Sequence, residues 1–263
     1  MEQQGYLQID EARLEYGWSG PGPTQAPTLV LLHEGLGCLA QWRDFPERLV
    51  AATGCGVFAY TRAGYGGSSP VTLPRPKDYV HREALGVLPQ VLDAVGIETA
   101  VLIGHSDGGS IALIHAGGVY DPRVRGAVTM AAHVFVEDVT LAGIRAARVA
   151  WEQRGLRERL AKYHGDNVDC AFFGWNDTWL RADFADWNLE HYLPAIHVPL
   201  LVMQGIDDEY GTPRQVEAIA AQTGGPVDAR LLENCAHNPV REQPEQVLGL
   251  IADFVHEVTG RAA

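Results

Sequence analysis

A short glycine-flanked segment in the middle of the chain constrains the fold more than any other feature. Residues 101–109 read Val-Leu-Ile-Gly-His-Ser-Asp-Gly-Gly, so that Ser106 has a glycine two positions away on either side. In this G-x-S-x-G pattern the serine occupies a strained turn between a strand and a helix, and the turn leaves no space for Cβ atoms at the glycine positions. An aliphatic run, residues 100–103, precedes the motif, and an amphipathic helical stretch, residues 110–119, follows it. The sequence therefore predicts that Ser106 presents a reactive hydroxyl at the end of a buried strand.

The composition is that of a globular protein with a large core, because 46% of the 263 residues are hydrophobic and 20% are charged. The length suits one large domain, or one domain with an insertion. We find neither an apolar run approaching the ~20 residues of a membrane span nor a secretory signal at the N-terminus, and we expect a cytoplasmic protein. The formal net charge of −13 argues against nucleic acid and anionic membranes as partners.

The cysteines are scattered along the chain and show no C-x-x-C spacing. They are Cys38, Cys55, Cys170 and Cys235. Such a distribution is more typical of free thiols in a reducing compartment than of a disulfide framework.

Short apolar runs alternate with amphipathic segments along most of the chain. The predicted strands are residues 6–9, 14–16, 28–32, 57–60, 100–103, 124–130, 200–203 and 227–232. The predicted helices are residues 41–52, 79–95, 110–119, 213–221 and 244–258. The first two strands alternate polar and apolar residues, as an antiparallel hairpin does, whereas continuous apolar runs indicate strands buried on both faces. The order predicts an α/β fold with a mostly parallel, eight-stranded sheet and helices on both faces.

Residues 133–193 interrupt this alternation, because they contain no convincing strand and have a helical period. They carry four of the six tryptophans and four of the seven phenylalanines. We interpret this segment as a helical cap inserted into a core domain made of residues 1–132 and 194–263. Some of its aromatic side chains are expected to face a cleft, because a segment of ~60 residues cannot bury all of them internally. The candidates for substrate binding in this segment are Phe135, Trp151, Trp175 and Trp179, and Glu34 of the core domain is a further candidate.

A serine hydroxyl becomes a good nucleophile near neutral pH when a base and a third, orienting group accompany it. For this kind of turn the acid and the histidine follow the serine along the chain. A predicted strand ends in Gly205-Ile206-Asp207-Asp208, and a later one leads into a loop that carries His237. His237 is therefore the candidate base, and Asp208 or Asp207 the candidate acid. The other histidines show no metal-ligand spacing, and we expect neither a metal nor a cofactor.

Five motifs in this order resemble those of the α/β-hydrolase fold superfamily, and in particular of serine carboxylesterases with a helical cap. They are His33-Glu34-Gly35-Leu36-Gly37, Arg62-Ala63-Gly64-Tyr65-Gly66-Gly67-Ser68, the turn at Ser106, Gly205-Ile206-Asp207-Asp208 and the loop of His237. The resemblance covers essentially the whole chain. It implies that Ser106 is the nucleophile and His237 the base. The family pattern G-x-x-D places the acid at Asp208, with Asp207 as the alternative.

The resemblance also implies the position of an oxyanion hole. One expected donor is the backbone N–H of Asp107, the residue after the nucleophile, and the other is the N–H of Gly35. Glu34 stands where relatives usually carry glycine, and its side chain either lies on the surface or reaches the cleft as a second acid. The Asp107 side chain either binds a substrate cation, anchors neighbouring backbone, or only adds negative charge at a helix N-terminus. Six basic residues between Arg145 and Lys162 are expected to form a solvated helix face rather than an entrance for an anionic substrate.

Taken together, these features predict a serine hydrolase that cleaves a carboxylic ester of a small to medium, partly apolar substrate through an acyl-enzyme. A thioesterase, a lactonase, an amidase or a carbon–carbon bond hydrolase would use the same three residues, because leaving-group preference depends on pocket shape. A ligand-binding receptor on the same fold is the alternative outside the enzymes. The sequence leaves the oligomeric state open.

Overall fold

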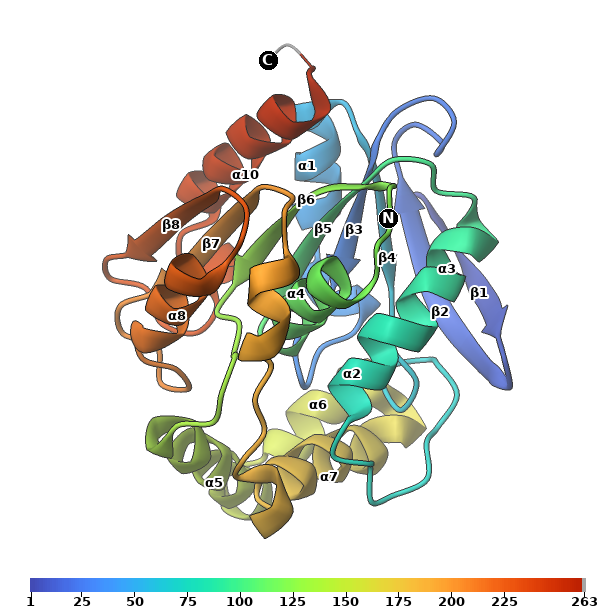
Figure 1. Ribbon diagram of the computed structural model, residues 1–263. Helices are drawn as coiled ribbons and strands as arrows, with labels where there is room; N and C mark the ends of the chain where they lie inside the picture. Colours follow the sequence, from blue (N-terminus) through green and yellow to red (C-terminus); the bar gives the residue numbers. More distant parts are fainter. Residues whose placement is uncertain (262–263) are drawn as a thin grey trace.

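Eight strands form one sheet in the computed structural model, which describes residues 1–261 (Figure 1). In spatial order they are β1 (Gln3–Ile9), β2 (Ala12–Ser19), β4 (Gly56–Tyr60), β3 (Thr28–Leu32), β5 (Ala100–His105), β6 (Val124–Met130), β7 (Leu200–Gly205) and β8 (Val227–Leu232). Strand β2 pairs antiparallel with both of its neighbours, and every pairing from β4 to β8 is parallel. The predicted mostly parallel sheet with an opening hairpin is confirmed.

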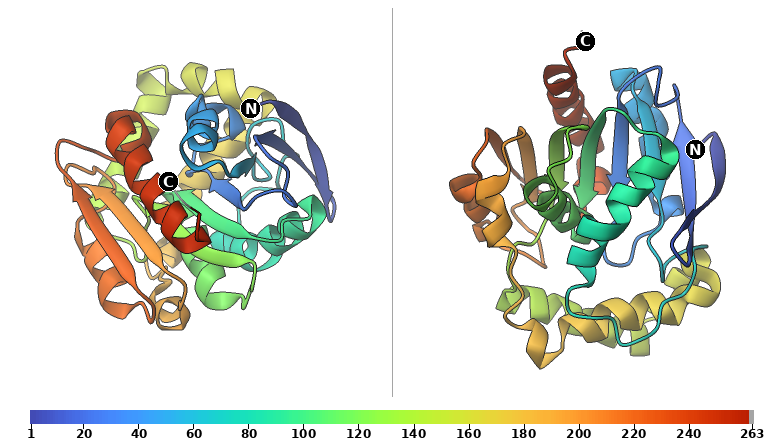
Figure 2. Two further views of the ribbon diagram at one scale, coloured as in Figure 1. Left: turned by 90° about the horizontal axis from the view of Figure 1, so that it is seen from above. Right: turned by 45° about the vertical axis from the view of Figure 1, so that its right-hand side comes forward.

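Helices cover both faces of the sheet (Figure 2). Helices α1 (Phe45–Thr53) and α10 (Pro244–Thr259) pack against each other on one face. The other face carries α4 (Asp107–Gly118), α8 (Arg214–Gln222) and one continuous helical segment made of α2 (Tyr79–Arg82), the π-helical turn η2 (Glu83–Val87) and α3 (Leu88–Val95). The shorter elements η1 (Leu39–Trp42) and α9 (Pro239–Glu242) lie in the connections. Gly96 ends α3 in the left-handed conformation, with φ of 72°, as a C-terminal glycine does.

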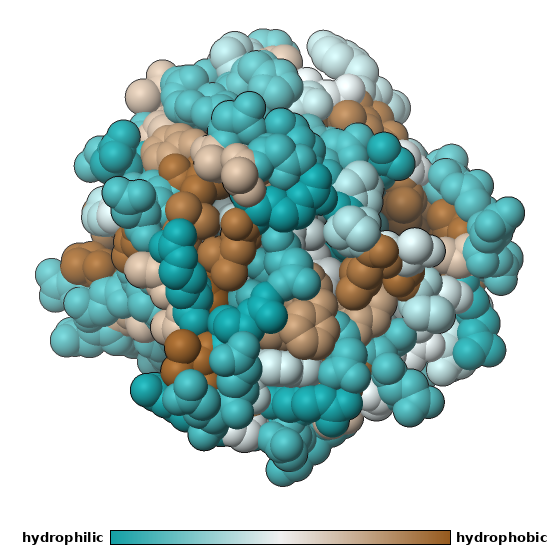
Figure 3. Space-filling view, turned by 90° about the horizontal axis from the view of Figure 1, so that it is seen from below, coloured by the Kyte–Doolittle hydropathy of each residue, from teal (hydrophilic) through white to brown (hydrophobic). Residues whose placement is uncertain are grey.

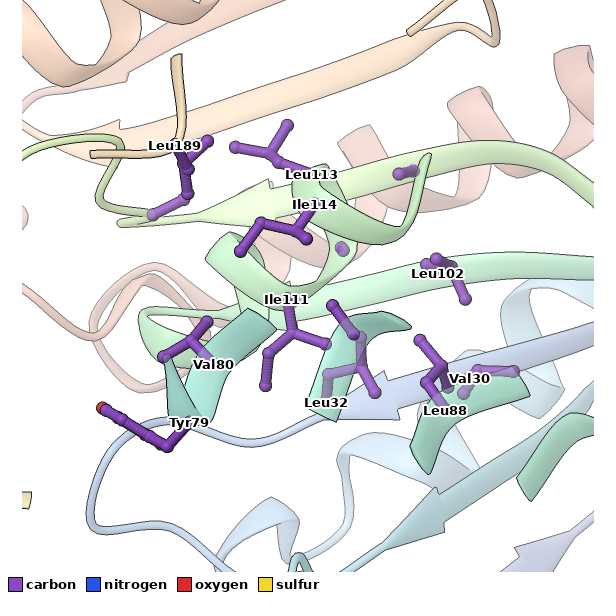
Figure 4. Packing of buried hydrophobic residues seen from close by; sticks show 14 of the residues in the cluster. Val30, Leu32, Tyr79, Val80, Leu88, Leu102, Ile111, Leu113, Ile114 and Leu189 are labelled. Atoms are coloured by element: carbon purple, nitrogen blue, oxygen red, sulfur yellow. The ribbon is translucent and has the colours of Figure 1, made fainter. Parts of the chain in front are cut away.

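The sheet separates two hydrophobic cores, because successive side chains of a strand point to opposite faces. In β3, Val30 and Leu32 enter the core beneath α2, α3 and α4, whereas Leu29 and Leu31 enter the core beneath α1 and α10. Figure 4 shows Val30, Leu32 and Leu102 of the sheet packed against side chains of the covering helices. This two-sided burial explains why the central strands appear in the sequence as continuous apolar runs.

Three further helices lie across the carboxyl ends of the strands, at the bottom of Figure 1: α5 (Asp138–Gln153), α6 (Leu156–His164) and α7 (Val168–Trp179). The short helix η3 (Gly165–Asn167) joins α6 to α7, whereas η4 (Ala182–Phe184) and η5 (Glu190–Ala195) follow α7. Helix η5 packs against α4. Seen from this side, the surface is mostly hydrophilic with several separate apolar patches (Figure 3). These helices lie where the sequence predicts a cap, and the domain limits at residues 133 and 193 stay a prediction.

Several predicted elements differ from the structure at their ends. The helix expected at residues 41–52 is divided into η1 and α1 by Arg43, whose φ is 52°, and α1 begins just before Pro46, a residue that fits only the first turn of a helix. Helix α4 begins at Asp107 rather than at residue 110, because the chain enters the helix directly after the turn at Ser106. Strands β5 and β7 continue two residues further than predicted, since their pairing with neighbouring strands continues.

All four cysteines are free thiols, as expected, with Cys170 half-buried and the other three buried. Among the helices of residues 1–261, none is both long enough and apolar enough to cross a bilayer.

Candidate active site

The turn at Ser106 joins the central strand β5 to α4. Ser106 has φ of 52° and ψ of −117°, a backbone conformation that residues with a side chain rarely adopt. A Cβ atom at Gly104 would meet the backbone of Gly108, and a Cβ atom at Gly108 would meet the carbonyl of Leu32. The two glycines therefore allow a tight crossing of strand and helix, and the serine is held at its apex.

Ser106, His237 and Asp208 form one hydrogen-bonded chain. The Nε2 atom of His237 lies 3.0 Å from the hydroxyl oxygen of Ser106, and its Nδ1 atom lies 2.8 Å from Oδ1 of Asp208. The three residues follow β5, β8 and β7, and the carboxyl ends of parallel strands meet at one edge of the sheet. In chemical terms, this arrangement can remove the proton from the serine hydroxyl and stabilise the resulting imidazolium.

The two neighbouring aspartates have different surroundings. Asp208 is buried, and its Oδ1 also accepts from the backbone N–H groups of Tyr210 at 2.8 Å and Gly211 at 3.3 Å. Burial by itself raises the pKa of Asp208, but the hydrogen bonds from His237 and Tyr210 lower it more, so the pKa lies below its usual value. Asp207 is exposed, and its own N–H donates to the carbonyl of Cys235 at 2.9 Å. The geometry favours Asp208 as the orienting acid.

Gly35 and Asp107 line the same cavity as Ser106. Within residues 1–261, neither of their backbone N–H groups has an acceptor. A Cβ atom on Gly35 would meet the indole of Trp175, which packs directly against this loop. The two amides predicted as oxyanion donors therefore belong to residues that line one cavity with Ser106, and no acceptor within residues 1–261 competes for their hydrogens.

Glu34 reaches the cavity and does not lie on the surface. Its Oε2 forms an ion pair with Nδ1 of His105 at 3.6 Å, and Nε2 of His105 donates to the carbonyl of His237 at 2.7 Å. Burial by itself lowers the pKa of His105, but the Glu34 carboxylate raises it more, so the net shift is upward. Burial of Glu34 opposes its ionisation, yet His105 lowers its pKa to about 2. The pair connects the loop after β3, the turn at Ser106 and the loop that carries His237.

The carboxylate of Asp107 is anchored inside the protein and is not free to bind a substrate cation. It is 2% exposed, accepts from the hydroxyl of Tyr79 at 2.7 Å and pairs with Nη1 of Arg62 at 3.5 Å. The hydroxyl of Tyr79 in turn accepts from the indole N–H of Trp179 at 3.0 Å. A chain of polar contacts thus connects α7 to the first residue of α4.

A cavity of about 110 Å³ opens beside Ser106, between the edge of the sheet and helices α5 and α7. Two of the predicted substrate-binding tryptophans, Trp175 and Trp179, line it. Five residues not predicted as site residues also line it: Leu36, His133, Thr140, Ile144 and Tyr210. His133 and Tyr210 follow β6 and β7, so their positions at carboxyl ends of strands were the available sequence signal. Thr140 and Ile144 carried no such signal.

Phe135 and Trp151 do not line the cavity as predicted. Trp151 stacks on Phe172 with ring centroids 4.0 Å apart, so it belongs to the apolar core of the cap helices. Phe135 forms an isolated bridge with Asn188 and lies beneath the guanidinium of Arg214. Some aromatic side chains of this segment thus line the cavity and others pack away from it, and their spacing in the sequence does not distinguish the two groups.

The basic residues of α5 and α6 do not enter the cavity. Arg148 pairs with Asp177, and Arg157 pairs with Asp169 at 2.9 Å on the outside of the helices. Their arrangement agrees with a solvated helix face. Within residues 1–261, no three His, Cys, Asp or Glu side chains are grouped so that they could hold a metal ion.

Comparison with known proteins identifies one family and similar solved structures that cover most of the chain. The model of the family described as "Alpha/beta hydrolase family" matches residues 29–250. The crystal structure of VinJ has 26% sequence identity and a TM-score of 0.78, covering 98% of this chain and 99% of that one. Naproxen esterase (carboxylesterase NP) from Bacillus subtilis has 21% identity and a TM-score of 0.73, covering 96% and 90%, a likeness that shows the fold alone.

A curated relative matches only a part of the chain. Epoxide hydrolase B of Mycobacterium tuberculosis is 35% identical over 94 residues, which are 35% of this chain. The matching segment spans 25% of the relative's own length.

We expect Asp208→Asn to lower kcat by about 10⁴-fold, because an amide no longer holds the reactive imidazole tautomer or stabilises the imidazolium. Asp207→Asn, a matched change one residue away on an exposed side chain, should leave kcat within about twofold. Steady-state kinetics with p-nitrophenyl acetate measure both variants. A larger loss of kcat in Asp207→Asn than in Asp208→Asn would identify Asp207 as the orienting acid.

We expect the ion pair between Glu34 and His105 to make stability depend on pH. The raised pKa of His105 adds stability that is complete below its ordinary value of 6.5 and is lost as the pH rises through the folded-state value. The lowered pKa of Glu34 adds stability that is complete above 4.5 and is lost as the pH falls toward about 2.

Between the ordinary pKa values of the two groups, 4.5 for Glu34 and 6.5 for His105, both contributions are present. Glu34→Gln should therefore lower the free energy of unfolding most in this pH range, by about 1–3 kcal/mol, and progressively less at higher pH. Urea unfolding of both proteins across the pH range tests this, with Glu98→Gln, an exposed change, as the control. A difference that does not vary with pH would show that the pair is not ionic.

Proposed function

The chain belongs to the alpha/beta hydrolase family, and we propose that it is a serine hydrolase that cleaves carboxylic esters through an acyl-enzyme. One observation carries the proposal: the hydroxyl of Ser106 lies 3.0 Å from the imidazole of His237, whose other nitrogen lies 2.8 Å from buried Asp208. A residue held in a strained turn, beside a base and an orienting acid, has the arrangement that activates a hydroxyl.

The proposed reaction proceeds in two halves. Ser106 Oγ attacks the carbonyl carbon of the ester while His237 accepts its proton, and the carbonyl oxygen becomes an oxyanion that the N–H groups of Gly35 and Asp107 stabilise. The oxyanion collapses, the carbon–oxygen bond to the alcohol breaks, and His237 returns the proton to the departing alcohol. In the second half, His237 deprotonates a water molecule that attacks the carbonyl carbon of the acyl-enzyme. The carbon–oxygen bond to Ser106 then breaks, His237 returns the proton to Ser106 Oγ, and the carboxylic acid leaves. Asp208, whose lowered pKa keeps it ionised, stabilises the imidazolium in both halves.

The lining of the cavity favours a small, uncharged acyl group. The apolar contacts come from Leu36, Ile144, Trp175 and Trp179, and the carboxylates present are those of Glu34 and Asp107. No lysine or arginine of residues 1–261 lines this cavity, so an anionic acyl group would meet no cation there. Thioesters, lactones, amides and activated carbon–carbon bonds present a similar carbonyl carbon, and turnover of a substrate panel distinguishes them.

Epoxide cleavage is supported less well than ester cleavage by this site. The curated relative named an epoxide hydrolase matches only 35% of this chain. A serine hydroxyl beside two free amides suits a carbonyl that becomes tetrahedral, and an epoxide has no carbonyl. Styrene oxide belongs in the substrate panel as the test of this alternative.

We expect a fluorophosphonate probe to label the protein covalently, and Ser106→Ala to abolish labelling and to lower ester turnover by about 10⁴–10⁶-fold. Mass spectrometry of the labelled peptide and p-nitrophenyl acetate hydrolysis measure the two effects. Ser69→Ala, a serine far along the chain from the turn, is the matched control. Labelling without turnover of any acyl substrate would favour a ligand-binding receptor, and absence of labelling would overturn the nucleophile assignment.

We expect kcat/KM for p-nitrophenyl esters to be highest for acetate to butyrate and to fall by about tenfold or more at octanoate, because the cavity is small. Trp175→Ala enlarges the cavity and should move the optimum to longer chains. Trp151→Ala removes an indole of the cap core that does not line the cavity, so it should leave the chain-length order unchanged. The same optimum in all three proteins would show that the acyl group binds elsewhere.

A further inference from the structure

Arg62 is a buried cation that touches none of the three triad side chains. It follows β4, and its side chain is 4% exposed. Its Nη2 donates to the carbonyl of Glu34 at 2.8 Å and to the carbonyl of His33 at 3.2 Å, while its Nη1 pairs with the Asp107 carboxylate at 3.5 Å. One guanidinium therefore contacts both segments that carry the predicted oxyanion donors.

The contact with Glu34 fixes the direction of the Gly35 amide. In a trans peptide the C=O and the N–H point in opposite directions, so when Arg62 holds the carbonyl of Glu34, the N–H of Gly35 points away from Arg62. The Nδ1 of His33 reinforces this, because it donates to the same carbonyl at 2.8 Å. The Nε2 of His33 accepts from the backbone N–H of Arg62 at 3.0 Å, which makes Nδ1 the donor. Gly35 itself lines the cavity beside Ser106.

The contact with Asp107 fixes the second donor. Asp107 is the first residue of α4, so its own N–H is free of the helix hydrogen bonds. Arg62 and the hydroxyl of Tyr79 hold its carboxylate from the side of the protein interior. A residue whose side chain is held at two points has little freedom to rotate its backbone amide.

We propose that Arg62 is a positioning residue for oxyanion stabilisation, because its single planar guanidinium holds the Gly35 and Asp107 amides in one fixed arrangement. The proposal rests on the proposed function and extends it. A lysine would keep the charge, but its ammonium is a point donor and does not match three acceptors on two segments. If Arg62 only neutralised the Asp107 carboxylate, a lysine at position 62 would be enough to keep wild-type kcat.

The test compares Arg62→Lys and Arg62→Met with the wild-type protein. We measure kcat and KM for p-nitrophenyl acetate and the Ki of a trifluoromethyl ketone, which forms a tetrahedral oxyanion on Ser106. Loss of one oxyanion donor typically lowers kcat by about 10²–10³-fold. We expect losses of roughly that size in Arg62→Met and of about 10-fold or more in Arg62→Lys, with KM within about threefold. The Ki should rise in parallel with the loss of kcat/KM.

Arg123→Met is the matched control, because Arg123 also pairs with carboxylates, Asp121 at 2.8 Å and Asp93, and lies away from the cavity. It should lower the thermal midpoint without changing kcat. The double variant Arg62→Met/Asp107→Asn removes the unpaired carboxylate and covers the case in which Arg62→Met does not fold. A double variant that remains slow supports the proposal, and one that regains wild-type kcat overturns it.

Retention of kcat and of Ki within twofold in Arg62→Lys would also overturn the proposal. Failure of the proposed function gives a different result, because the wild-type protein would then neither react with a fluorophosphonate nor hydrolyse the ester. In that case both proposals are wrong. If the wild-type protein reacts and the Arg62 variants keep its kcat and Ki, only this inference is contradicted.

Discussion

The sharp turn at Ser106 is the constraint on which the rest of the site depends. It places a serine with φ of 52° at the end of a central strand and starts a helix at the next residue. The crossing is possible because Gly104 and Gly108 have no Cβ atoms that would meet neighbouring backbone. Burial of β5 between two cores holds the strained conformation in place, since any relaxation would disturb packing on both faces of the sheet. The strain is therefore offset by the core, and the hydroxyl is presented at a fixed point.

Around this turn, buried polar and charged side chains connect segments that are distant in the sequence. His237 is hydrogen-bonded to Asp208, and ion pairs join His105 to Glu34 and Arg62 to Asp107. An unpaired charge in such a place would cost several kcal/mol, so each pair resists separation of the segments that carry it. Such pairs are weak evidence for high stability. Their consequence here is geometric, because they hold the loop after β3, the loop after β4, the start of α4 and the loop after β8 in one arrangement beside the nucleophile.

The nucleophile and the walls of the cavity come from different layers of the molecule. The sheet edge supplies Ser106, Asp208 and His237, whereas α5 and α7 supply Ile144, Trp175 and Trp179. Acyl-group preference can therefore change through the helices without altering the geometry at the serine. The indole of Trp179 also donates to Tyr79, which holds the Asp107 carboxylate, so one tryptophan contacts both the cavity and the anchoring of the turn.

The sequence by itself determined the order and type of the sheet elements and the candidates for nucleophile, base and acid, because these depend on local patterns: apolar runs, a glycine-flanked serine, and acidic or histidine residues just after strands. It favoured Asp208 over Asp207 through the family pattern alone, and the tertiary structure supplies the physical difference between them, since burial and hydrogen bonding depend on the fold of the whole loop. The same holds for Trp151 and Trp175, two indoles in adjacent helices of one helical segment, of which one stacks in the cap core and the other lines the cavity. Arg62 is the clearest case: the contacts that give it a role join residues 62, 34 and 107, and no local pattern encodes an interaction that exists only after three loops have come together.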